Sequence, residues 1–532
     1  MHQSMRDVLP VFGICARGTG TGLGRGPVRW LSCALVVVAA TPVQAQDSLR
    51  SAGAGQRQNI LQPRASITES FSNNIELSRT QPRSDALTKL AAGVSFQSNA
   101  GRIRGLLDYE LTGLLYTRNS ELNTYQNALR ANLGADLIEN RARVDVQAGI
   151  TQSARSAFGV QPGTSGLPSS NVTELRSLSI TPSFVGPLGP AVQYKAGLTY
   201  SLSDARGTTA GDTTGNYAFM QLSPSSPGVV QWTVDMSSMH TNFKAGRKTA
   251  NTRLYGTLSR NIDALDLQVK ASAGVETTDI NAFERASYQN WGIGATWMPS
   301  PRTKVVAQLD QRFFGNGHVL SFEHRTALTT WTFSDTRSLR SSGNGTATGG
   351  QGTTFDLYFA QFAAIEPDRA KRTDLVNSFL KANGLSAGAG SSSGFLRSSE
   401  TVVRAQNASV AYRGRRSAAV LTYGRSVNVP VAGVLLPSDD FINTSSIVTD
   451  TASMSLSHRL TPMSSVNLII RYDQSHGDRP QQMSSQREIC LQYLASLNQR
   501  SNLTVGARRA MYKTFQSPYN ESAVFATYGI RF

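Results

Sequence analysis

Cysteine is scarce in this chain, and long apolar runs are scarcer still. Cys15 and Cys33 lie near the start, so the part after residue 45 keeps only Cys490 and cannot form an internal disulfide. Hydrophobic residues make up 39% of the chain, which is little for a compact core in roughly 490 residues. After residue 45 no apolar run is long enough to cross a membrane as a helix. These absences exclude a disulfide scaffold and a helical membrane protein.

Catalytic and metal-binding patterns are also missing. None of the six histidines is paired at metal-ligand spacing, and there is no nucleophile elbow or P-loop. The sequence leaves open only a Ser and a His brought together across strands. We therefore expect no enzyme activity, no cofactor and no metal. The net charge is +17, but the basic residues are dispersed, which argues against nucleic-acid binding.

The first apolar segment has the features of a secretory signal. Arg25 and Arg29 precede an apolar run from Trp30 to Ala40, which is too short to span a membrane. Small residues then predict cleavage between Ala45 and Gln46. A buried helix or a membrane anchor is the alternative. We expect a signal peptide over 1–45 and a short periplasmic segment over 46–62.

The remainder of the chain alternates apolar and polar residues. Examples are 129–137, 142–151, 192–202, 265–276, 291–297, 466–472 and 489–497, each roughly ten residues long. A period of two predicts β-strands with two different faces. Ten residues suit a tilted strand that crosses hydrocarbon, whereas a soluble sandwich uses shorter strands and covers its apolar faces.

The connections between these segments alternate between short and long. Short ones occur at 99–101, 139–140, 186–190, 224–228, 299–301, 461–462 and 498–499, and long ones at 72–83, 153–171, 203–216, 237–248, 426–445 and 474–484. This alternation is typical of an outer-membrane β-barrel. The predicted fold is therefore an all-β antiparallel transmembrane barrel over 63–532, in the outer membrane of a Gram-negative bacterium. We expect about 22 strands, within a range of 18–22, and both termini on the short-turn side.

The chain ends on an alternating strand. Tyr528, Ile530 and Phe532 form its apolar face, and we expect them to point outward. A barrel must pair its last strand with its first, because hydrocarbon offers no water to an open edge. The pattern resembles the signal read by the barrel-assembly machinery, and an ordinary edge strand is the alternative.

One segment, 338–399, breaks the alternation. It is rich in Gly and Ser around a predicted helix that begins at Pro367 and ends at Gly384. By strand parity it leaves from the long-loop side. It could enter the lumen as a constriction, cap the mouth, or form a flexible surface loop with a transient helix.

Several motifs resemble the PEP-CTERM system-associated outer-membrane family. They are Pro63–Ile75, Trp297–Thr303, Arg312–Gly315, Asn383–Leu385, Gly394–Leu396 and Ser457–Pro462. The family usually has a Tyr near the position of His318, so this detail departs from it. The resemblance covers about 63–532. It implies a barrel that accompanies exopolysaccharide production and exosortase protein sorting. It implies no catalytic residues in this chain.

Charged residues on the polar face of the predicted strands are candidates for the lumen wall. They are Arg104, Asp108, Glu110, Lys195, Asp266, Lys270, Asp310, Arg312 and Arg471. Their mixed signs fit either cross-strand pairs or a solute path. The basic excess favours anionic partners, such as acidic polysaccharide in the lumen or lipopolysaccharide phosphates outside.

Two functions follow from these features. The protein is either a conduit or secretion component for exopolysaccharide, working with periplasmic secretion components, or a structural or binding barrel. In the second case its loops would retain polymer or sorted proteins at the cell surface. The state of the lumen distinguishes the two.

Overall fold

The computed structural model divides the chain into two units, Met1–Gly55 and Gln56–Phe532, and every described residue belongs to the second unit. The described residues are 59–98, 101–159, 167, 169–226, 228–340, 358–359, 372, 376, 395–431, 440–515 and 518–532. The predicted cleavage site at Ala45 and Gln46 lies outside them.

The described residues form 22 strands in a single antiparallel sheet. The strands are β1 (Asn59–Ser72), β2 (Asp85–Ser98), β3 (Ile103–Tyr116), β4 (Thr124–Ile138), β5 (Ala142–Ala154), β6 (Val172–Leu188), β7 (Val192–Ala205), β8 (Thr213–Pro224), β9 (Val230–Phe243), β10 (Lys248–Ile262), β11 (Leu267–Thr278), β12 (Ala286–Ser300), β13 (Thr303–Arg312), β14 (Gly315–Arg325), β15 (Thr329–Arg340), β16 (Thr401–Arg413), β17 (Ser417–Pro430), β18 (Ile447–Thr461), β19 (Ser464–His476), β20 (Met483–Ser496), β21 (Ser501–Thr514) and β22 (Tyr519–Arg531). Each strand pairs with the next along the chain.

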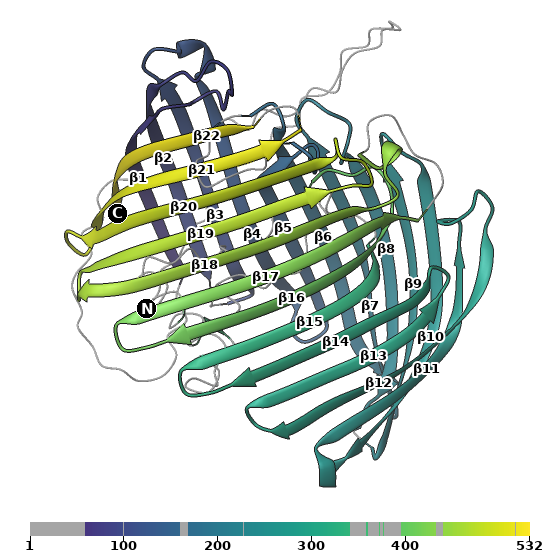
Figure 1. Ribbon diagram of the computed structural model, residues 1–532. Coiled ribbons are helices and arrows are strands. Elements are labelled where there is room, and N and C mark those ends of the chain that lie inside the picture. Colours follow the sequence, from purple (N-terminus) through teal and green to yellow (C-terminus); the bar gives the residue numbers. More distant parts are fainter. Residues whose placement is uncertain are drawn as a thin grey trace, which may run out of the picture. The chain divides into compact units, whose positions relative to one another are not determined.

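The sheet closes on itself between β22 and β1, which lie side by side in Figure 1. The register runs from Arg64 opposite Arg531 to Ser72 opposite Ala523. The Thr68 and Thr527 hydroxyls are 2.8 Å apart across this seam, and the backbone N–H of Phe532 donates to the carbonyl of Pro63 at 3.0 Å. Closure leaves no unpaired strand edge, as the terminal strand predicted. The expected barrel of about 22 strands is confirmed.

The two ends of the barrel differ in the length of their connections. Short turns join β2 to β3, β4 to β5, and so on to β20 and β21; we call this the turn end, and the other the loop end. Both β1 and β22 have their outer termini at the turn end, as expected. The prediction of a long loop over 237–248 is wrong, because β9 continues to Phe243 and β10 begins at Lys248. Polar residues there belong to strands that extend beyond the expected ten residues.

Helical structure is sparse among the described residues. The elements η1 (Ser120–Leu122), η2 (Asp263–Leu265) and η3 (Asp440–Asn443) are single 3-10 turns. Of the predicted helix over 367–384, only Arg372 and Val376 are described; both are helical, and the helix itself stays a prediction. Within the described ranges no helix is long and apolar enough to cross a membrane. β1 begins at Asn59, slightly before the expected Pro63.

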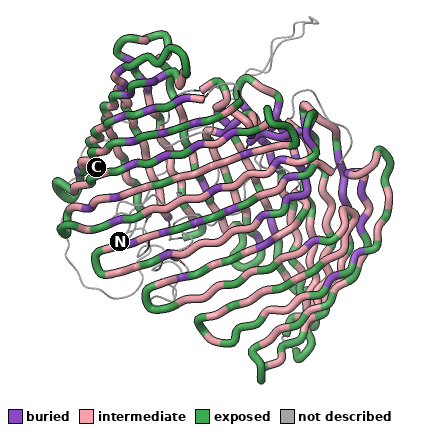
Figure 2. Tube along the Cα trace, in the orientation of Figure 1, coloured by how far each residue is buried: buried purple, intermediate pink, exposed green. Residues whose placement is uncertain are grey.

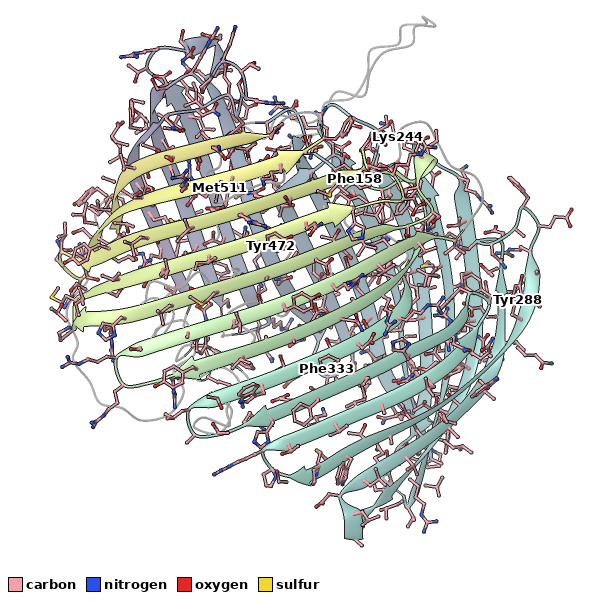
Figure 3. The ribbon with its side chains drawn as sticks, in the orientation of Figure 1. Phe158, Lys244, Tyr288, Phe333, Tyr472 and Met511 are labelled. Atoms are coloured by element: carbon pink, nitrogen blue, oxygen red, sulfur yellow. The ribbon has the colours of Figure 1, made fainter. Side chains whose placement is uncertain are left out.

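The two faces of the closed sheet have different compositions. On one face large apolar residues are exposed, for example Leu111, Ile293 and Leu309. The alternate positions carry the polar and charged residues and enclose the lumen. We call these faces outward and inward. Phe333, Tyr472 and Met511 mark the outward face in Figure 3. Buried residues gather toward the loop ends of the strands (Figure 2).

Candidate functional site in the barrel lumen

Most of the predicted lumen charges lie on the inward face. The register places eight of them at alternate positions opposite one another or opposite other inward residues: Arg104, Asp108, Glu110, Lys195, Lys270, Asp310, Arg312 and Arg471. Asp266 is different. It lies in the β10–β11 turn with φ of 47°, where the chain reverses, and is exposed outside any strand. The alternation from Leu265 predicts a strand that begins there, two residues before the observed start of β11 at Leu267.

An arginine crosses one strand to reach acids on the next. Arg64 on β1 lies opposite Gly93 on β2, which lies opposite Glu110 on β3. The guanidinium is 2.7 Å from Asp108 and 3.1 Å from Glu110. A Cβ at Gly93 would be 3.0 Å from Cζ of Arg64, so the glycine leaves the space that the guanidinium occupies. Arg64 was not among the predicted site residues, because its acidic partners lie on β3, which is not adjacent to β1.

The same arrangement occurs on the opposite wall. Lys270 on β11 reaches over Gly294 on β12, and its Nζ lies 2.6 Å from Oε1 of Gln308 on β13. A Cβ at Gly294 would lie 2.5 Å from Cε of Lys270. Glycines on the inward face therefore allow long polar side chains to lie flat along the wall and link three strands.

A third cluster surrounds Glu276 near the loop end. This side chain has 0% exposure and is bonded by Arg312 from β13, by Asn251 at 2.7 Å and by Asn290 at 3.1 Å. Arg312 precedes the two-residue connection Phe313–Phe314, and Gly315 follows it with φ of 93°. The Arg312–Gly315 motif thus makes the tightest hairpin at the loop end, and its arginine holds a carboxylate two strands away.

Loops from distant strands meet across the loop-end mouth. Ala157, in the β5–β6 connection, donates its N–H to Asp440 at 2.7 Å and accepts from Ser484 of β20 at 3.1 Å. The Tyr512 hydroxyl of β21 donates to the carbonyl of Phe158 at 3.3 Å. Seven pairing steps around the sheet separate β5 from β20, so these contacts cross the opening rather than follow the wall.

The segment Phe395–Glu400 also crosses this mouth. Phe395 packs with Ala154, Phe441 and Ile447, and the N–H of Leu396 donates to the carbonyl of Ala154 at 2.9 Å. This segment leads directly into β16, yet it contacts β5. In pairing order β5 and β16 are on opposite sides of a 22-strand sheet. We call residues 155–158, 395–400 and 440–444 the mouth segments.

Tyr358, in the segment between β15 and β16, lies at the other end of the barrel. Tyr358 has 0% exposure, and its hydroxyl lies 3.4 Å from the carbonyl oxygen of Tyr412 and 3.3 Å from that of Ala419. These carbonyls flank the β16–β17 turn at the turn end. Eleven residues separate Thr401 from Tyr412 along β16, which is about 36 Å at ~3.3 Å per residue.

Tyr358 itself lies on the lumen side of the wall. Ala411 and Ala418, which alternate with Tyr412 and Ala419 and face inward, are fully buried. The position of this one residue fits the predicted constriction, which stays a prediction. Reasoning from sequence missed the other mouth segments, although Phe158 and Phe441 are apolar residues in polar loops.

Comparison with known proteins gives a likeness of fold only. No protein-family model matches the chain, and neither does any curated protein. The FrpB iron transporter of Neisseria meningitidis is 10% identical with a TM-score of 0.47, covering 88% of this chain and 81% of its own. The siderophore receptor PirA of Acinetobacter baumannii is 9% identical with a TM-score of 0.44, covering 90% and 81%. OccK11 of Pseudomonas aeruginosa is 12% identical with a TM-score of 0.30, covering 89% and 96%.

The protein is an outer-membrane β-barrel. A closed antiparallel barrel with an apolar outward face, a polar lumen, short turns at one end and long loops at the other has this location. In the described part of the chain, no three His, Cys, Asp or Glu side chains gather as a metal site would require.

Proposed function

We propose that the protein is a gated conduit for an anionic exopolysaccharide, in which the 341–400 insert is the gate. The position of Tyr358 carries this proposal, because this residue of the insert lies at the turn end of the lumen, although the insert begins and ends at the loop end. A barrel of 22 strands is too wide for wall side chains to fill, so a lumen of this size is either wet or occupied.

The anionic, polymeric nature of the solute rests on two supports. Polar side chains such as Arg64 and Lys270 lie along the inward wall and are paired there, and with the net charge of +17 such a hydrated wall suits a hydrated anionic polymer. The resemblance to the PEP-CTERM system-associated family supplies the link to exopolysaccharide and to periplasmic secretion components. Tyr528, Ile530 and Phe532 stay our proposed signal for the barrel-assembly machinery; the register puts Tyr528 and Ile530 on the outward face.

Single-channel conductance in a planar bilayer tests the gate. We would compare the intact chain with a deletion of 343–394, which keeps the mouth segment Phe395–Glu400, and with Tyr358→Ala. A deletion of 79–82 in the exposed β1–β2 loop is the matched control. We expect small or rare steps from the intact protein and the control, large steps from the deletion, and intermediate opening from Tyr358→Ala. Polygalacturonate should block the enlarged current more strongly than neutral dextran of equal size.

A second function is favoured by the mouth segments. Contacts such as Ala157 to Asp440 tie distant walls together, which suits a closed barrel that retains polymer or sorted proteins on its loops. An absence of current steps from the 343–394 deletion, in protein shown by heat-modifiable gel mobility to be folded, would contradict the conduit. Binding of polymer to the intact protein under those conditions would support the retaining barrel instead.

A further inference from the structure

The outward face carries an uneven distribution of charge near the loop end. We consider outward positions within seven residues of the loop end of each described strand. On β14–β22 these are six basic residues against two acidic ones: Arg337, Arg404, Arg425, Arg487, Arg509 and Lys513 against Asp335 and Asp450. On β1–β13 they are two basic against three acidic: Arg176 and Lys248 against Glu69, Glu174 and Asp204. The outward positions of β14–β22 are thus strongly basic, and we call them the basic arc.

The acids of the basic arc leave much of this positive charge in place. Asp335 is buried and shared by Arg404, at 2.7 Å, and His318, at 2.9 Å. Asp450 lies 3.8 Å from Arg425. The side chains of Arg404 and Arg425 nevertheless stay 48% and 44% exposed.

Two arginines of the arc directly oppose each other. Arg337 and Arg404 are cross-strand partners on β15 and β16. Like charges in this position destabilise a sheet. Asp335 offsets the charge of Arg404, whereas Arg337 donates to the uncharged carbonyl of Asn316. Arg487 and Arg509 continue the row on β20 and β21, where both are exposed and Arg487 stacks on Tyr472 at 5.5 Å. The arc therefore presents several guanidinium groups, which bind phosphate oxygens in bidentate fashion.

The height of the arc indicates which anion reaches it. Toward the turn end the outward face of the same strands is apolar, with exposed Leu421, Leu456 and Leu491. Tyr423 and Tyr472 lie at the border, where aromatic belts meet the headgroups. A ligand on the arc thus has its acyl chains on the apolar band and its anionic group on the arginines. A soluble polymer inside the lumen would not meet side chains that point away from it.

We propose that the basic arc binds the phosphorylated headgroups of the outer-leaflet glycolipid. The proposal depends on the barrel's place in the outer membrane and is independent of whether the lumen conducts. It assigns glycolipid to one side of the barrel, since β1–β13 lack the same excess of positive charge.

Binding of bisphosphorylated lipid A to the full barrel tests the assignment. The barrel would be purified in zwitterionic detergent, and bound lipid counted by native mass spectrometry at 50 and 200 mM salt. The test variant is R425Q/R487Q/R509Q, which leaves the Asp335 cluster intact, and the matched control is R176Q/K248Q on the opposite side. We expect at least tenfold weaker binding and a smaller salt dependence for the test variant, with the control within twofold of the intact protein.

Further arms separate the possible ligands. Dephosphorylated lipid A should bind about as weakly to the intact barrel as lipid A does to the test variant. Equal binding of both lipids, or equal losses in the test and control variants, would overturn the proposal. Competition by inorganic phosphate or by soluble polygalacturonate at the affinity of lipid A would overturn it too, and would identify a general anion site. If the triple variant does not fold, Arg487→Gln alone, with an expected loss of about threefold, decides the question.

Discussion

The loop end and the turn end of this barrel are built from the same strands, yet they treat polar side chains differently. At the loop end, Glu276 is fully buried and held by partners from three other strands. At the turn end, Arg104 pairs with Asp136 at 3.0 Å but remains 59% exposed. The wall chemistry is similar, and the difference is the number of side chains around each carboxylate. Asn251, Asn290 and Arg312 enclose Glu276, whereas the Arg104–Asp136 pair is open to water on the lumen side.

The largest effect should separate the buried pair from the exposed one. Arg312→Ala leaves the Glu276 carboxylate buried without its cation, which costs about 3–5 kcal/mol in comparable proteins. Arg104→Ala at the turn end should cost about 0.2–1 kcal/mol, because exposed pairs are screened by water. Guanidinium unfolding of the barrel in detergent, followed by tryptophan fluorescence, measures both. Equal losses of unfolding free energy in the two variants would contradict the contrast between the two ends.

The next effect concerns the mouth segments at the loop end. Phe441 is fully buried among the mouth segments, whereas the adjacent Ile442 is 41% exposed. Phe441→Ala should weaken the local packing by about 3 kcal/mol, as for other buried aromatics, and leave the strands folded. We expect faster protease cleavage in the mouth segments and more frequent current openings. Ile442→Ala serves as the control, and cleavage as fast as in Phe441→Ala would argue against a packed mouth.

Between the two ends, the strand-crossing side chains depend on glycine. A Cβ at Gly93 would lie 2.7 Å from the carbonyl oxygen of Tyr109 and 3.0 Å from Cζ of Arg64, so Gly93→Ala should cost about 1–3 kcal/mol. At Gly113 the nearest atom is 3.9 Å away, and Gly113→Ala should be close to neutral. The midpoint of guanidinium unfolding distinguishes the two. An unchanged midpoint for Gly93→Ala would mean that the Arg64 cluster contributes little.

The smallest effect is a pH dependence confined to the loop end. The N–H of Ser445 donates to Asp478 at 2.5 Å and holds the pKa of this exposed carboxyl below its usual range. A lowered folded-state pKa gives stability that is present above the ordinary aspartate pKa and is lost as the pH falls through the folded value. We expect protease cleavage beside Ser445 to rise on acidification. Asp478→Asn should remove that dependence; an unchanged acid response in this variant would assign it to another group.

The sequence by itself determined the barrel. Alternating segments of about ten residues, joined by connections that are short on one side and mostly long on the other, have one solution in a membrane, since every backbone group must be paired and the apolar face must meet lipid. The same period of two placed Arg104, Lys270 and Arg312 on the inward face, because a strand sends alternate side chains to opposite sides.

Only the tertiary structure decided what fills and surrounds that barrel. Arg64 finds acids two strands away, Ala157 meets Ser484 across the mouth, and Tyr358 reaches the turn end of β16. The row of outward arginines likewise exists only once β15 to β21 are in register. Such contacts depend on curvature and closure of the whole sheet, which no local periodicity encodes, because each strand determines which way its side chains point but not which distant strand they will face.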